Sequence, residues 1–308
     1  MSDIDKTKKV PNSITINGEI FSYIHTRHYV PVSIFKGNNS FLRIGQKKFI
    51  LNDLKKHKSL IESGFVVPII LADGVQEQEY YYIEKSIGNI SIGDALEADY
   101  MKTGVVTDKN FEKFLLAVTD FIDKQINSAK VKKEGMIENL YQEIHMREIL
   151  NELPLLKCEL MDALRKIEKR LSRLPVVLTH GDFKASNIFE RGIIDFERVF
   201  YAPIGYDLVT SIYHPFNYPV VGNYEKLRKY QFSKKQIRDY VAAVNIIFTK
   251  NGLPEFSDTL EEFLVARTIM FCARMHKWPK LQQWGYERLE RILRNYIAGK
   301  DITKIAMQ

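Results

Sequence analysis

The sequence predicts an α+β protein with two lobes, in which an antiparallel β-sheet with one helix forms the N-terminal lobe and helices dominate the C-terminal lobe. Three observations predict this class. Short segments with alternating apolar residues, separated by turn residues, fill residues 13–88. Apolar residues at helical spacing dominate from about residue 91 onward. One stretch, residues 176–207, returns to strands and gathers polar side chains at their ends.

Composition agrees with a large globular core. The chain has 308 residues, 45% of them hydrophobic, which is enough for two lobes. No apolar run approaches the roughly 20 residues of a membrane span, and the N-terminus is polar, so we expect a cytoplasmic protein with no membrane partner. The net charge of +7 suits anionic ligands but also simply keeps a protein soluble. The two cysteines lack metal-ligand spacing, so two buried, reduced thiols are expected.

The N-terminal lobe begins with a hairpin. Residues 1–12 are charged, end near a proline and are expected to form a flexible tail, so the lobe spans residues 13–88. Asn17-Gly18 is the strongest two-residue turn signal, and alternating apolar residues flank it. A second antiparallel pair is predicted at Val30–Phe35 and Ser40–Ile44.

The rest of this lobe contains one helix and a third strand pair. Phe49–Ser63 has apolar residues at near-helical spacing and ends at Gly64, which is typical of a helix C-terminus. Val66–Leu71 and Glu79–Lys85 read as strands. Five or more antiparallel strands with one helix are therefore expected.

The C-terminal lobe, residues 89–308, is predicted to be mostly helical. Apolar stripes run through residues 111–126, 137–151, 155–171 and, as three helices, 234–298. The charged run at residues 130–135 indicates a solvated loop rather than a nucleic-acid patch, so no nucleic acid is expected as a partner. Arg267, Arg274, Lys277, Arg288, Arg291 and Arg294 are expected on the outside of the last helices.

Residues 176–207 carry the densest set of chemical side chains. A buried strand at Val176–Leu178 leads into His180-Gly181-Asp182, so Asp182 stands at a strand end. Asn187 follows five residues later, and a strand, a turn and a second strand lead to Asp195. A hairpin brings its two ends together, so Asp182, Asn187 and Asp195 are expected to converge.

These three residues are the types that phosphoryl transfer needs. One carboxylate accepts the proton of the attacking hydroxyl, while an amide oxygen and a second carboxylate hold the Mg²⁺ ions that bridge the nucleotide phosphates. Asp, Asn at plus five, a strand, a turn and Asp form the arrangement of a kinase catalytic loop. We therefore assign Asp182 as the catalytic base and Asn187 and Asp195 as metal ligands.

The strings HGDFKASN, IIDFE and GYDL, in this order, resemble the aminoglycoside phosphotransferase and choline kinase superfamily, whose fold is like that of protein kinases. The resemblance implies a protein kinase-like fold, ATP or GTP as phosphoryl donor, and Mg²⁺. Gly181 departs from the usual His-Arg-Asp. Asp207 can cap a helix or, by resemblance, brace the catalytic loop, and His180 is expected to support that loop.

The nucleotide-binding residues follow from the same resemblance. YYYIEKSIG, ending at Gly88, is similar to the inter-lobe hinge of the superfamily, so backbone groups from Glu84 to Ser86 are expected to bind the adenine. Arg43, in the predicted third strand, stands where a kinase Lys contacts phosphates, although it can also be an ordinary surface Arg. Asp53 is the candidate acidic partner of Arg43, but an Asp near a helix N-terminus is also ordinary capping.

Two features of the nucleotide and acceptor sites stay open. No Gly-x-Gly-x-x-Gly occurs, so the phosphate loop is either Lys36–Ser40 or His25–His28. Tyr213–Pro219 falls where the superfamily places part of its acceptor site, and its aromatic rings suit a sugar or a cationic head group, although it can equally be a packed loop. Trp278 and Trp284 flank a kink predicted at Pro279 and are candidates to close the acceptor pocket.

The sequence thus predicts an ATP- and Mg²⁺-dependent phosphotransferase that acts on a hydroxyl of a small molecule, such as an aminoglycoside, a choline-like amino alcohol or a sugar. Two alternatives remain: a kinase with a protein acceptor, or a catalytically weak nucleotide-binding module of the same fold. The Ala-Pro-Glu and Asp-Phe-Gly strings of protein kinases are absent, which disfavours the first alternative. A monomer or a homodimer is expected.

Overall fold

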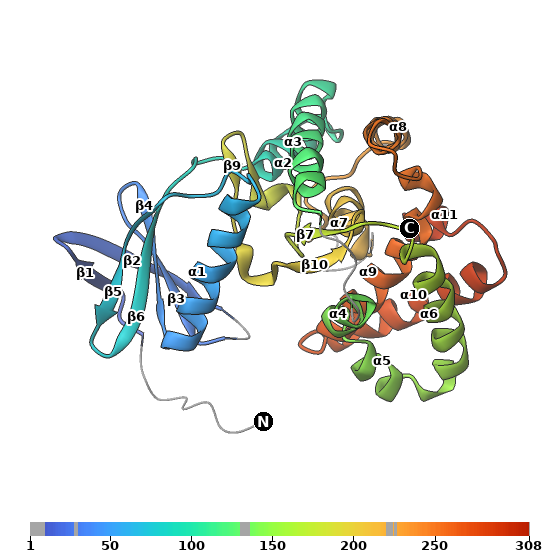
Figure 1. Ribbon diagram of the computed structural model, residues 1–308, viewed down its shortest axis with the longest axis horizontal. Helices are drawn as coiled ribbons and strands as arrows, with labels where there is room; N and C mark the ends of the chain where they lie inside the picture. The colour runs from blue at the N-terminus through green and yellow to red at the C-terminus, as the bar shows by residue number, and fades with distance from the viewer. Residues whose placement is uncertain (1–9, 28–29, 130–135, 220–223, 225–226, 308) are drawn as a thin grey trace. The chain divides into compact units, whose positions relative to one another are not determined.

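The computed structural model describes residues 10–27, 30–129, 136–219, 224 and 227–307. Within these, the chain divides into two compact units (Figure 1). The N-terminal unit contains the described residues up to Asn89 together with Arg191–Glu197, and the C-terminal unit contains Ile90–Glu190 and the chain from Arg198 onward. The predicted loop at residues 130–135 and most of the predicted tail lie outside the described residues.

The N-terminal unit is built on a six-stranded antiparallel sheet with the strand order β1-β2-β3-β4-β6-β5. Its strands are β1 (Ser13–Ile16), β2 (Glu19–Thr26), β3 (Val32–Lys36), β4 (Ser40–Gly45), β5 (Ile70–Gln76) and β6 (Glu79–Lys85). Asn17 and Gly18 have positive φ angles of 51° and 81°, as the predicted two-residue turn requires. This confirms the antiparallel sheet that the sequence predicts.

One predicted strand begins later than expected. The segment Val66–Leu71 was expected to be extended in the sheet, but β5 starts at Ile70. Pro68 has no N–H to donate to a sheet ladder, and its carbonyl accepts a hydrogen bond from His57 Nε2 at 2.7 Å. The backbone carbonyl of Val66 is also used outside the sheet, because it accepts the N–H of Ile193.

Helix α1 (Lys47–Glu62) covers one face of the sheet (Figure 1). Ile50 of α1 packs against Val32 and Tyr82 of the sheet. The opposite face has its own core, formed by Ile16, Phe21, Phe35, Leu42, Ile44, Tyr81 and Ile83. The chain leaves α1 through Gly64, whose φ of +83° favours glycine at a helix C-terminus.

The C-terminal unit is mostly helical, as predicted. Its α-helices are α2 (Ile92–Thr103), α3 (Asp108–Asn127), α4 (Met136–Glu143), α5 (Met146–Glu152), α6 (Lys157–Leu171), α7 (Tyr206–Tyr213), α8 (Lys234–Lys250), α9 (Leu260–Arg274), α10 (Pro279–Ile297) and α11 (Thr303–Ala306). Short 3₁₀ helices are η1 (Pro154–Leu156), η2 (Ala185–Asn187), η4 (His214–Asn217) and η6 (Phe256–Asp258), and η3 (Phe196–Arg198) lies at the boundary between the units. No described helix has the length and apolar character to cross a membrane.

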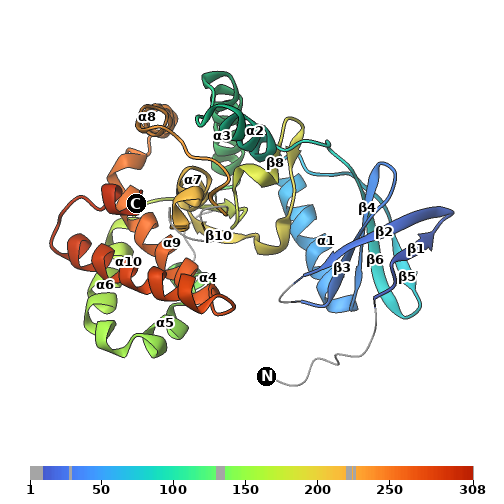
Figure 2. The same ribbon diagram turned by 180° about the vertical axis from the view of Figure 1, so that it is seen from behind.

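Helix α9 forms the centre of the C-terminal unit. Almost all of its residues are buried, and it lies beside α10 in both views (Figure 1 and Figure 2). Side-chain caps define the ends of several surrounding helices. Ser91 begins α2 and Ser233 begins α8, each through a reciprocal capping box with the residue three positions later.

The structure corrects four predictions in this unit. The helix predicted over 137–151 is divided into α4 and α5, because His145 between them has a left-handed φ of 56°. Arg267 and Arg288 are buried rather than outside, and each donates to backbone carbonyls. Pro279 does not kink a helix but begins α10, where its missing N–H has no cost. Cys158 is exposed, and only Cys272 is buried.

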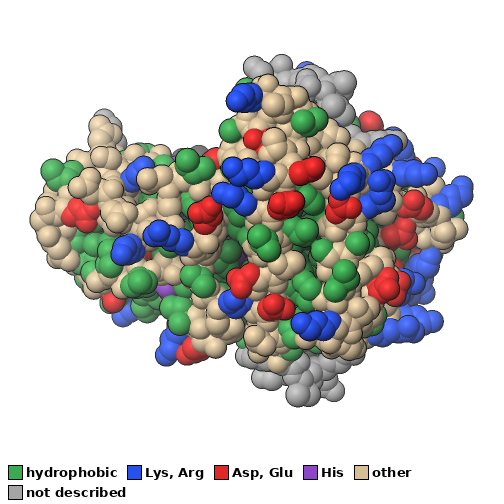
Figure 3. All heavy atoms as spheres, turned by 90° about the horizontal axis from the view of Figure 1, so that it is seen from above, with side chains coloured by type: hydrophobic (Ala, Val, Ile, Leu, Met, Phe, Trp, Pro, Cys, Tyr) green, Lys and Arg blue, Asp and Glu red, His purple; other side chains and the backbone are tan. Residues whose placement is uncertain are grey.

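Charged side chains on the surface alternate in sign. Figure 3 shows Lys and Arg side chains interspersed with Asp and Glu side chains on the face in view. Several of the ion pairs are exposed and join residues one helical turn apart, as in Lys124 with Asp120 and Lys235 with Asp239. This distribution fits the interpretation that much of the positive net charge serves solubility.

Candidate active site

Strand β7 (Val176–Thr179) delivers the predicted catalytic loop. All four of its residues are buried, and it pairs antiparallel with β10 (Phe200–Pro203), so that Thr179 lies opposite Phe200. The chain turns at Gly181, which has a φ of +79°. A Cβ there would stand 2.2 Å from the carbonyl oxygen of Arg198, so only glycine fits. This close approach explains why the loop has glycine where protein kinases have Arg.

Asp207 of α7 holds the backbone of the candidate catalytic loop through hydrogen bonds. Its Oδ2 accepts the N–H of His180 at 2.7 Å and the side-chain amide of Gln125 at 2.9 Å, and its Oδ1 accepts the N–H of Gly181 at 2.9 Å. Burial raises the pKa of Asp207, while these donors and nearby positive charge oppose the shift. The residue does not cap α7, whose N-cap is Gly205. The structural role predicted for Asp207 is therefore confirmed.

Asp182 presents a partly exposed carboxylate at the end of this loop. Its side chain is 20% exposed, and Oδ2 lies 2.9 Å from the ammonium nitrogen of Lys184. Burial would raise the pKa of Asp182, but the positive charges of Lys184, Arg198 and Arg267 outweigh burial and lower the pKa below its ordinary value. The carboxylate is therefore ionised at neutral pH and can accept a hydrogen bond from an incoming hydroxyl.

Asn187 is tied directly to the same loop. Its side-chain Nδ2 donates to the backbone carbonyl of Asp182 at 2.9 Å. Its backbone N–H donates to Lys184 at 2.8 Å, within the turn η2. Gly93 of α2 permits this turn to lie close, because a Cβ on Gly93 would stand 2.6 Å from the backbone nitrogen of Ser186. The structure thus brings together two of the three residues predicted from the motif, Asp182 and Asn187.

Beyond Asn187 the chain forms the predicted hairpin. Strands β8 (Ile188–Phe189) and β9 (Gly192–Ile193) are joined by a two-residue turn, and the boundary between the two units falls at this turn. Asp195 consequently belongs to the N-terminal unit, where its charge lies within electrostatic range of Arg43. The convergence of Asp195 with Asp182 stays a prediction of the sequence.

Arg43 forms a buried ion pair with Glu84. The two residues come from neighbouring strands, β4 and β6, and their side chains are 7% and 4% exposed. Nε and Nη2 of Arg43 lie 3.0 and 2.8 Å from Oε1 of Glu84. Burial opposes the charge of Arg43, but Glu84 outweighs burial and raises the pKa of Arg43 above its ordinary value. Nη1 of Arg43 and Oε2 of Glu84 have no hydrogen-bond partner among the described residues.

The prediction that Asp53 is the acidic partner of Arg43 is therefore wrong. Asp53 of α1 instead binds Arg27, with 2.6 Å between Oδ2 and Nη1. Glu84 displaces Asp53 as the partner of Arg43 because the register of β4 and β6 pairs Arg43 with Tyr82, two residues before Glu84 on the same face of the sheet. Sequence spacing alone did not reveal this register.

The predicted hinge backbone is already partly hydrogen-bonded. The N–H of Ser86 donates to the carbonyl of Asn39 at 3.0 Å, and the N–H of Lys85 donates to Ile69 at 2.8 Å. The hydroxyl of Ser86 donates to the carbonyl of Gly88. An adenine contact through the N–H of Ser86 would therefore have to replace its bond to Asn39.

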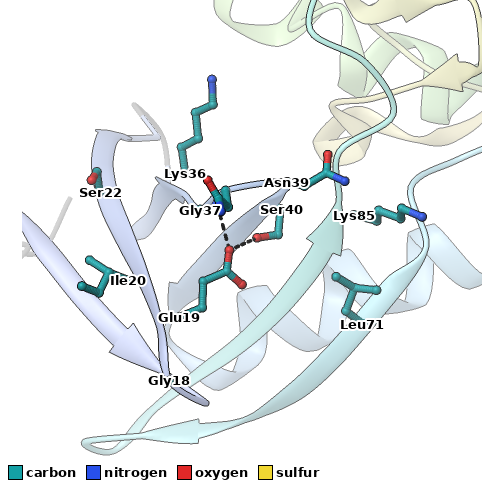
Figure 4. A pocket seen from close by; sticks show the side chains of 11 residues that line it. Gly18, Glu19, Ile20, Ser22, Lys36, Gly37, Asn39, Ser40, Leu71 and Lys85 are labelled. Atoms are coloured by element: carbon teal, nitrogen blue, oxygen red, sulfur yellow. Dashed lines mark hydrogen bonds between the residues drawn. The ribbon is translucent and has the colours of Figure 1, made fainter.

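The turn Lys36–Ser40, one of the two candidate phosphate loops, is closed by a carboxylate. Glu19 Oε1 accepts the N–H of Asn38 at 2.9 Å and the hydroxyl of Ser40 at 2.7 Å (Figure 4). These residues line an open pocket of about 880 Å³ in the N-terminal unit, with Lys36 and Lys85 at its edge. A phosphate could use the donors of this turn only if Glu19 moved away. The other candidate loop, His25–His28, ends at a residue outside the described ones, and the choice between the two loops stays a prediction.

Two aromatic residues that were predicted to border the acceptor, Tyr218 and Trp284, pack against the same ring, Phe271. Tyr218 packs edge-on against Phe271 with 5.7 Å between ring centroids, and Phe271 packs edge-on against Trp284 at 6.5 Å. The charge of Asp182 acts on Tyr218, whose pKa is raised mainly by burial. Trp278, by contrast, is 47% exposed.

Sequence reasoning assigned no role at the site to Lys184, Gln125 or Arg267, whose side chains contact the candidate catalytic loop or the residue that holds it. Lys184 could have been found, because it lies only two residues after Asp182. Arg267 donates to the carbonyl of Gly181 at 3.3 Å and to the hydroxyl of Tyr206 at 3.1 Å, but it lies 86 residues from Gly181 in the chain. No local pattern signals such a contact.

Comparison with known proteins agrees with this geometry. Residues 130–240 match the model of a phosphotransferase enzyme family, described as APH, and this range contains the whole catalytic loop. The chain resembles this family. The matched residues are about a third of the chain, and they lie around Asp182, Asn187 and Asp195. No curated protein sequence matches the chain.

Solved structures show the same fold. A thermostable mutant of the aminoglycoside phosphotransferase APH(4)-Ia, in a ternary complex with ADP and hygromycin B, aligns with a TM-score of 0.56 at 11% identity over 89% of this chain and 93% of that chain. The ethanolamine kinase of Plasmodium vivax aligns with a TM-score of 0.51 at 14% identity over 91% of this chain and 83% of that one. The protein kinase-like fold predicted from the sequence is therefore confirmed.

Proposed function

We propose that the protein is an ATP- and Mg²⁺-dependent phosphotransferase that phosphorylates a hydroxyl group of a small molecule. The observation that carries this proposal is the catalytic loop. Its carboxylate, Asp182, is ionised, partly exposed and held by a turn whose backbone N–H groups are bound by Asp207. A positioned carboxylate at the end of a strand is what the acceptor hydroxyl requires for proton removal.

Asn187 and Asp195 are the proposed metal ligands. The described residues contain no cluster of three His, Cys, Asp or Glu side chains that would hold a metal without a nucleotide. Mg²⁺ in phosphotransferases needs only one or two protein oxygens, because phosphate oxygens and water complete its shell. Asn187 fits, since its amide nitrogen is used by the carbonyl of Asp182 and its amide oxygen is left for a cation. Bound Mg²⁺ would neutralise charge on the transferring phosphate.

Arg43 is the proposed phosphate-binding residue. Its guanidinium is fixed by Glu84 through Nε and Nη2, while the buried Nη1 lacks a hydrogen-bond partner among the described residues. A buried, charged N–H without an acceptor is costly, and a phosphate oxygen would satisfy it. Backbone groups from Glu84 to Ser86 are proposed for the adenine, with ATP as the donor and GTP to be tested beside it.

The acceptor is proposed to be a neutral or weakly charged hydroxyl compound rather than a polycation. Lys184, Arg198 and Arg267 surround Asp182 closely enough to lower its pKa, and their positive charge would repel an aminoglycoside. The rings of Tyr218, Phe271 and Trp284 offer apolar faces of the kind that sugars and amino alcohols bind.

The test is phosphoryl transfer with a panel of sugars, amino alcohols and aminoglycosides, measured as formation of ADP from ATP or of GDP from GTP. Acceptor-dependent ADP formation is expected for at least one neutral hydroxyl compound. Asp182→Asn should lower kcat by about 10²- to 10⁴-fold, because positioned general bases contribute that much. Its nucleotide affinity and Tm should change little. Full activity of Asp182→Asn would overturn the assignment of the base.

A protein acceptor and a catalytically weak module are separate outcomes of the same assay. Nucleotide binding without turnover of any small molecule would favour the weak module. ADP formation that depends on an added protein, and not on the panel, would favour the protein kinase alternative.

A further inference from the structure

A second buried ion-pair network lies in the N-terminal unit, apart from Arg43 and Glu84, and the proposed mechanism does not use it. Arg27 follows β2 and has a side chain that is only 6% exposed. Its Nη1 donates to Oδ2 of Asp53 at 2.6 Å. Its Nε lies 3.2 Å from Oε2 of Glu197, whose side chain is 32% exposed, and this contact is an ion pair without hydrogen-bond geometry. Lys56, three residues after Asp53 in α1, donates to the backbone carbonyl of Glu197. Helix α1 and Arg27 thus hold Glu197 through both its side chain and its backbone.

These contacts attach the segment that carries Asp195. On one side of Asp195, the N–H of Ile193 donates to the carbonyl of Val66 at 3.0 Å, and Gly192 lies so close to the same oxygen that a Cβ would stand 2.3 Å from it. On the other side, Glu197 is held by Arg27 and Lys56. Residues 192–197 are therefore fixed to the N-terminal unit at both ends, and Asp195 is the residue between the two attachments.

The backbone of Asp195 needs such support. Its φ of 70° is left-handed, a conformation that costs a non-glycine residue roughly 1 kcal/mol or more and persists only where the surroundings enforce it. The ring of Phe196 adds an edge-on contact to His57 of α1, with 5.5 Å between centroids. Without the attachment at Glu197, the segment could relax and Asp195 would lose its defined direction.

Charge gives Arg27 a second effect. Glu197 stands two residues from Asp195 and carries a carboxylate that could compete with it for a cation. The ion pair with Arg27 draws one oxygen of that carboxylate toward Arg27, and Asp53 in turn keeps the buried Arg27 compensated. Arg43 is occupied by Glu84 on a separate strand, so the two arginines have distinct partners.

We propose that Arg27, anchored by Asp53, is a positioning residue that holds residues 191–197 so that Asp195 is directed to bind Mg²⁺. Asp53 of α1 therefore pairs with Arg27, which holds the segment of the proposed metal ligand, and not with Arg43, which is proposed to bind phosphate. This inference rests on the proposed function for the role of Asp195, but the attachment of the segment itself does not.

The first variant is Arg27→Met, which keeps much of the apolar stem and removes the charge. The matched control is Glu62→Gln, which removes a carboxylate from the exposed Lys58–Glu62 ion pair at the end of α1. Calorimetric titration measures the affinity for ADP with and without Mg²⁺, and hydrogen exchange measures the protection of residues 191–197. Thermal unfolding records the general loss of stability.

The ratio of ADP affinity with Mg²⁺ to ADP affinity without Mg²⁺ should be about 10- to 100-fold smaller in Arg27→Met than in the wild type. This is the range by which metal affinity falls when residues that orient metal ligands are removed. The affinity without Mg²⁺ should stay within about twofold, since no proposed nucleotide contact is changed. Exchange at residues 191–197 should accelerate, and Glu62→Gln should leave both readouts unchanged. Arg27→Lys, which keeps the charge but not the two-pronged geometry, should lie between Arg27→Met and the wild type.

A folded Arg27→Met protein with an unchanged Mg²⁺-dependent gain and unchanged exchange would overturn the proposal. Removing one member of a buried pair can prevent folding, so Arg27→Met with Asp53→Leu, which removes both charges, and Glu197→Gln serve as second variants with the same expected readouts. If the wild type shows no Mg²⁺-dependent ADP binding, the proposed function fails. Hydrogen exchange then decides the positioning claim alone: faster exchange at residues 191–197 supports it, and unchanged exchange refutes it.

Discussion

The side-chain amide of Asn187 donates a hydrogen bond to the backbone carbonyl of Asp182, with 2.9 Å between the two atoms. The bond joins the side chain of the proposed metal ligand to the backbone of the proposed base, five residues earlier in the chain, and so helps to hold the loop between them. The bond also leaves the amide oxygen for a cation, because the nitrogen is occupied and no described residue donates to the oxygen. One contact therefore links the position of the base with the chemistry of the metal site.

Asn187→Ala should damage both functions of this amide. Loss of the hydrogen bond is expected to lower the free energy of unfolding by about 1 kcal/mol, and loss of the oxygen should weaken Mg²⁺-dependent nucleotide binding. Denaturant unfolding and Mg²⁺-titrated ADP binding measure the two effects separately. Asn187→Ser provides a smaller oxygen ligand and should recover part of the metal dependence. If only stability changed in both variants, Asn187 would be a structural residue.

Lys184→Met should move the acid limb of kcat/KM to higher pH. Lys184 helps to hold the pKa of Asp182 below its ordinary value against the opposing effect of burial. Without this cation the carboxylate binds a proton more readily, so the proposed base is lost at a higher pH as the solution is acidified. A pH profile of kcat/KM checks the direction, with Lys184→Arg as a control that keeps the charge. An acid limb that moves to lower pH, or is unchanged, would contradict the pairing.

His214 should make the protein less stable below neutral pH. Burial and the nearby Lys184 lower the pKa of His214 from 6.5 to about 4. Between these two pH values the unfolded chain binds a proton that the folded protein does not, so the free energy of unfolding falls as the pH is lowered from about 6.5 to about 4. The loss from this one residue is at most about 3 kcal/mol. Tm measured against pH should become flatter in this range in His214→Asn, and an equally steep curve would exclude His214 as the cause.

The proposed role of Arg43 in phosphate binding can be tested separately from the contribution of its ion pair to stability. Arg43→Met leaves Glu84 buried and unpaired, which is expected to cost about 3–5 kcal/mol of stability. The double variant Arg43→Met with Glu84→Met removes both charges and should recover most of that stability. Nucleotide affinity should stay low in both variants, because both lack the Arg43 guanidinium that is proposed to bind phosphate. Recovery of ADP binding in the double variant would mean that Arg43 does not bind phosphate.

Tyr218 and Trp284 should affect the acceptor and not the nucleotide. Both rings pack against Phe271, and Tyr218 lies within range of the charge of Asp182. Tyr218→Ala and Trp284→Ala are expected to raise the KM of the acceptor and to leave that of ATP nearly unchanged. Leu155→Ala is the control, because Leu155 is 94% exposed and has no proposed role at the site. Steady-state kinetics with the best acceptor of the panel decides this, and a change confined to the KM of ATP would place the acceptor elsewhere.

The sequence by itself determined the order of the main elements and the local structure of the candidate catalytic loop. The turn at Asn17-Gly18, the helix ending at Gly64 and the strand before His180 all depend on local backbone chemistry, which residues near one another in the chain specify. Asp182 and Asn187 are five residues apart, so their contact follows from a single turn. The predicted fold class was correct for the same reason.

Only the tertiary structure decided which charged residues pair. Arg43 binds Glu84 and not Asp53, Arg27 binds Asp53 and Glu197, and Arg267 is buried against Gly181 instead of lying outside. The partners in these pairs are 26 to 170 positions apart, at places set by strand register and helix packing. Any arginine can pair with any carboxylate as far as its own chemistry is concerned, so the choice is made by which of them the folded backbone brings within about 3 Å in a buried place.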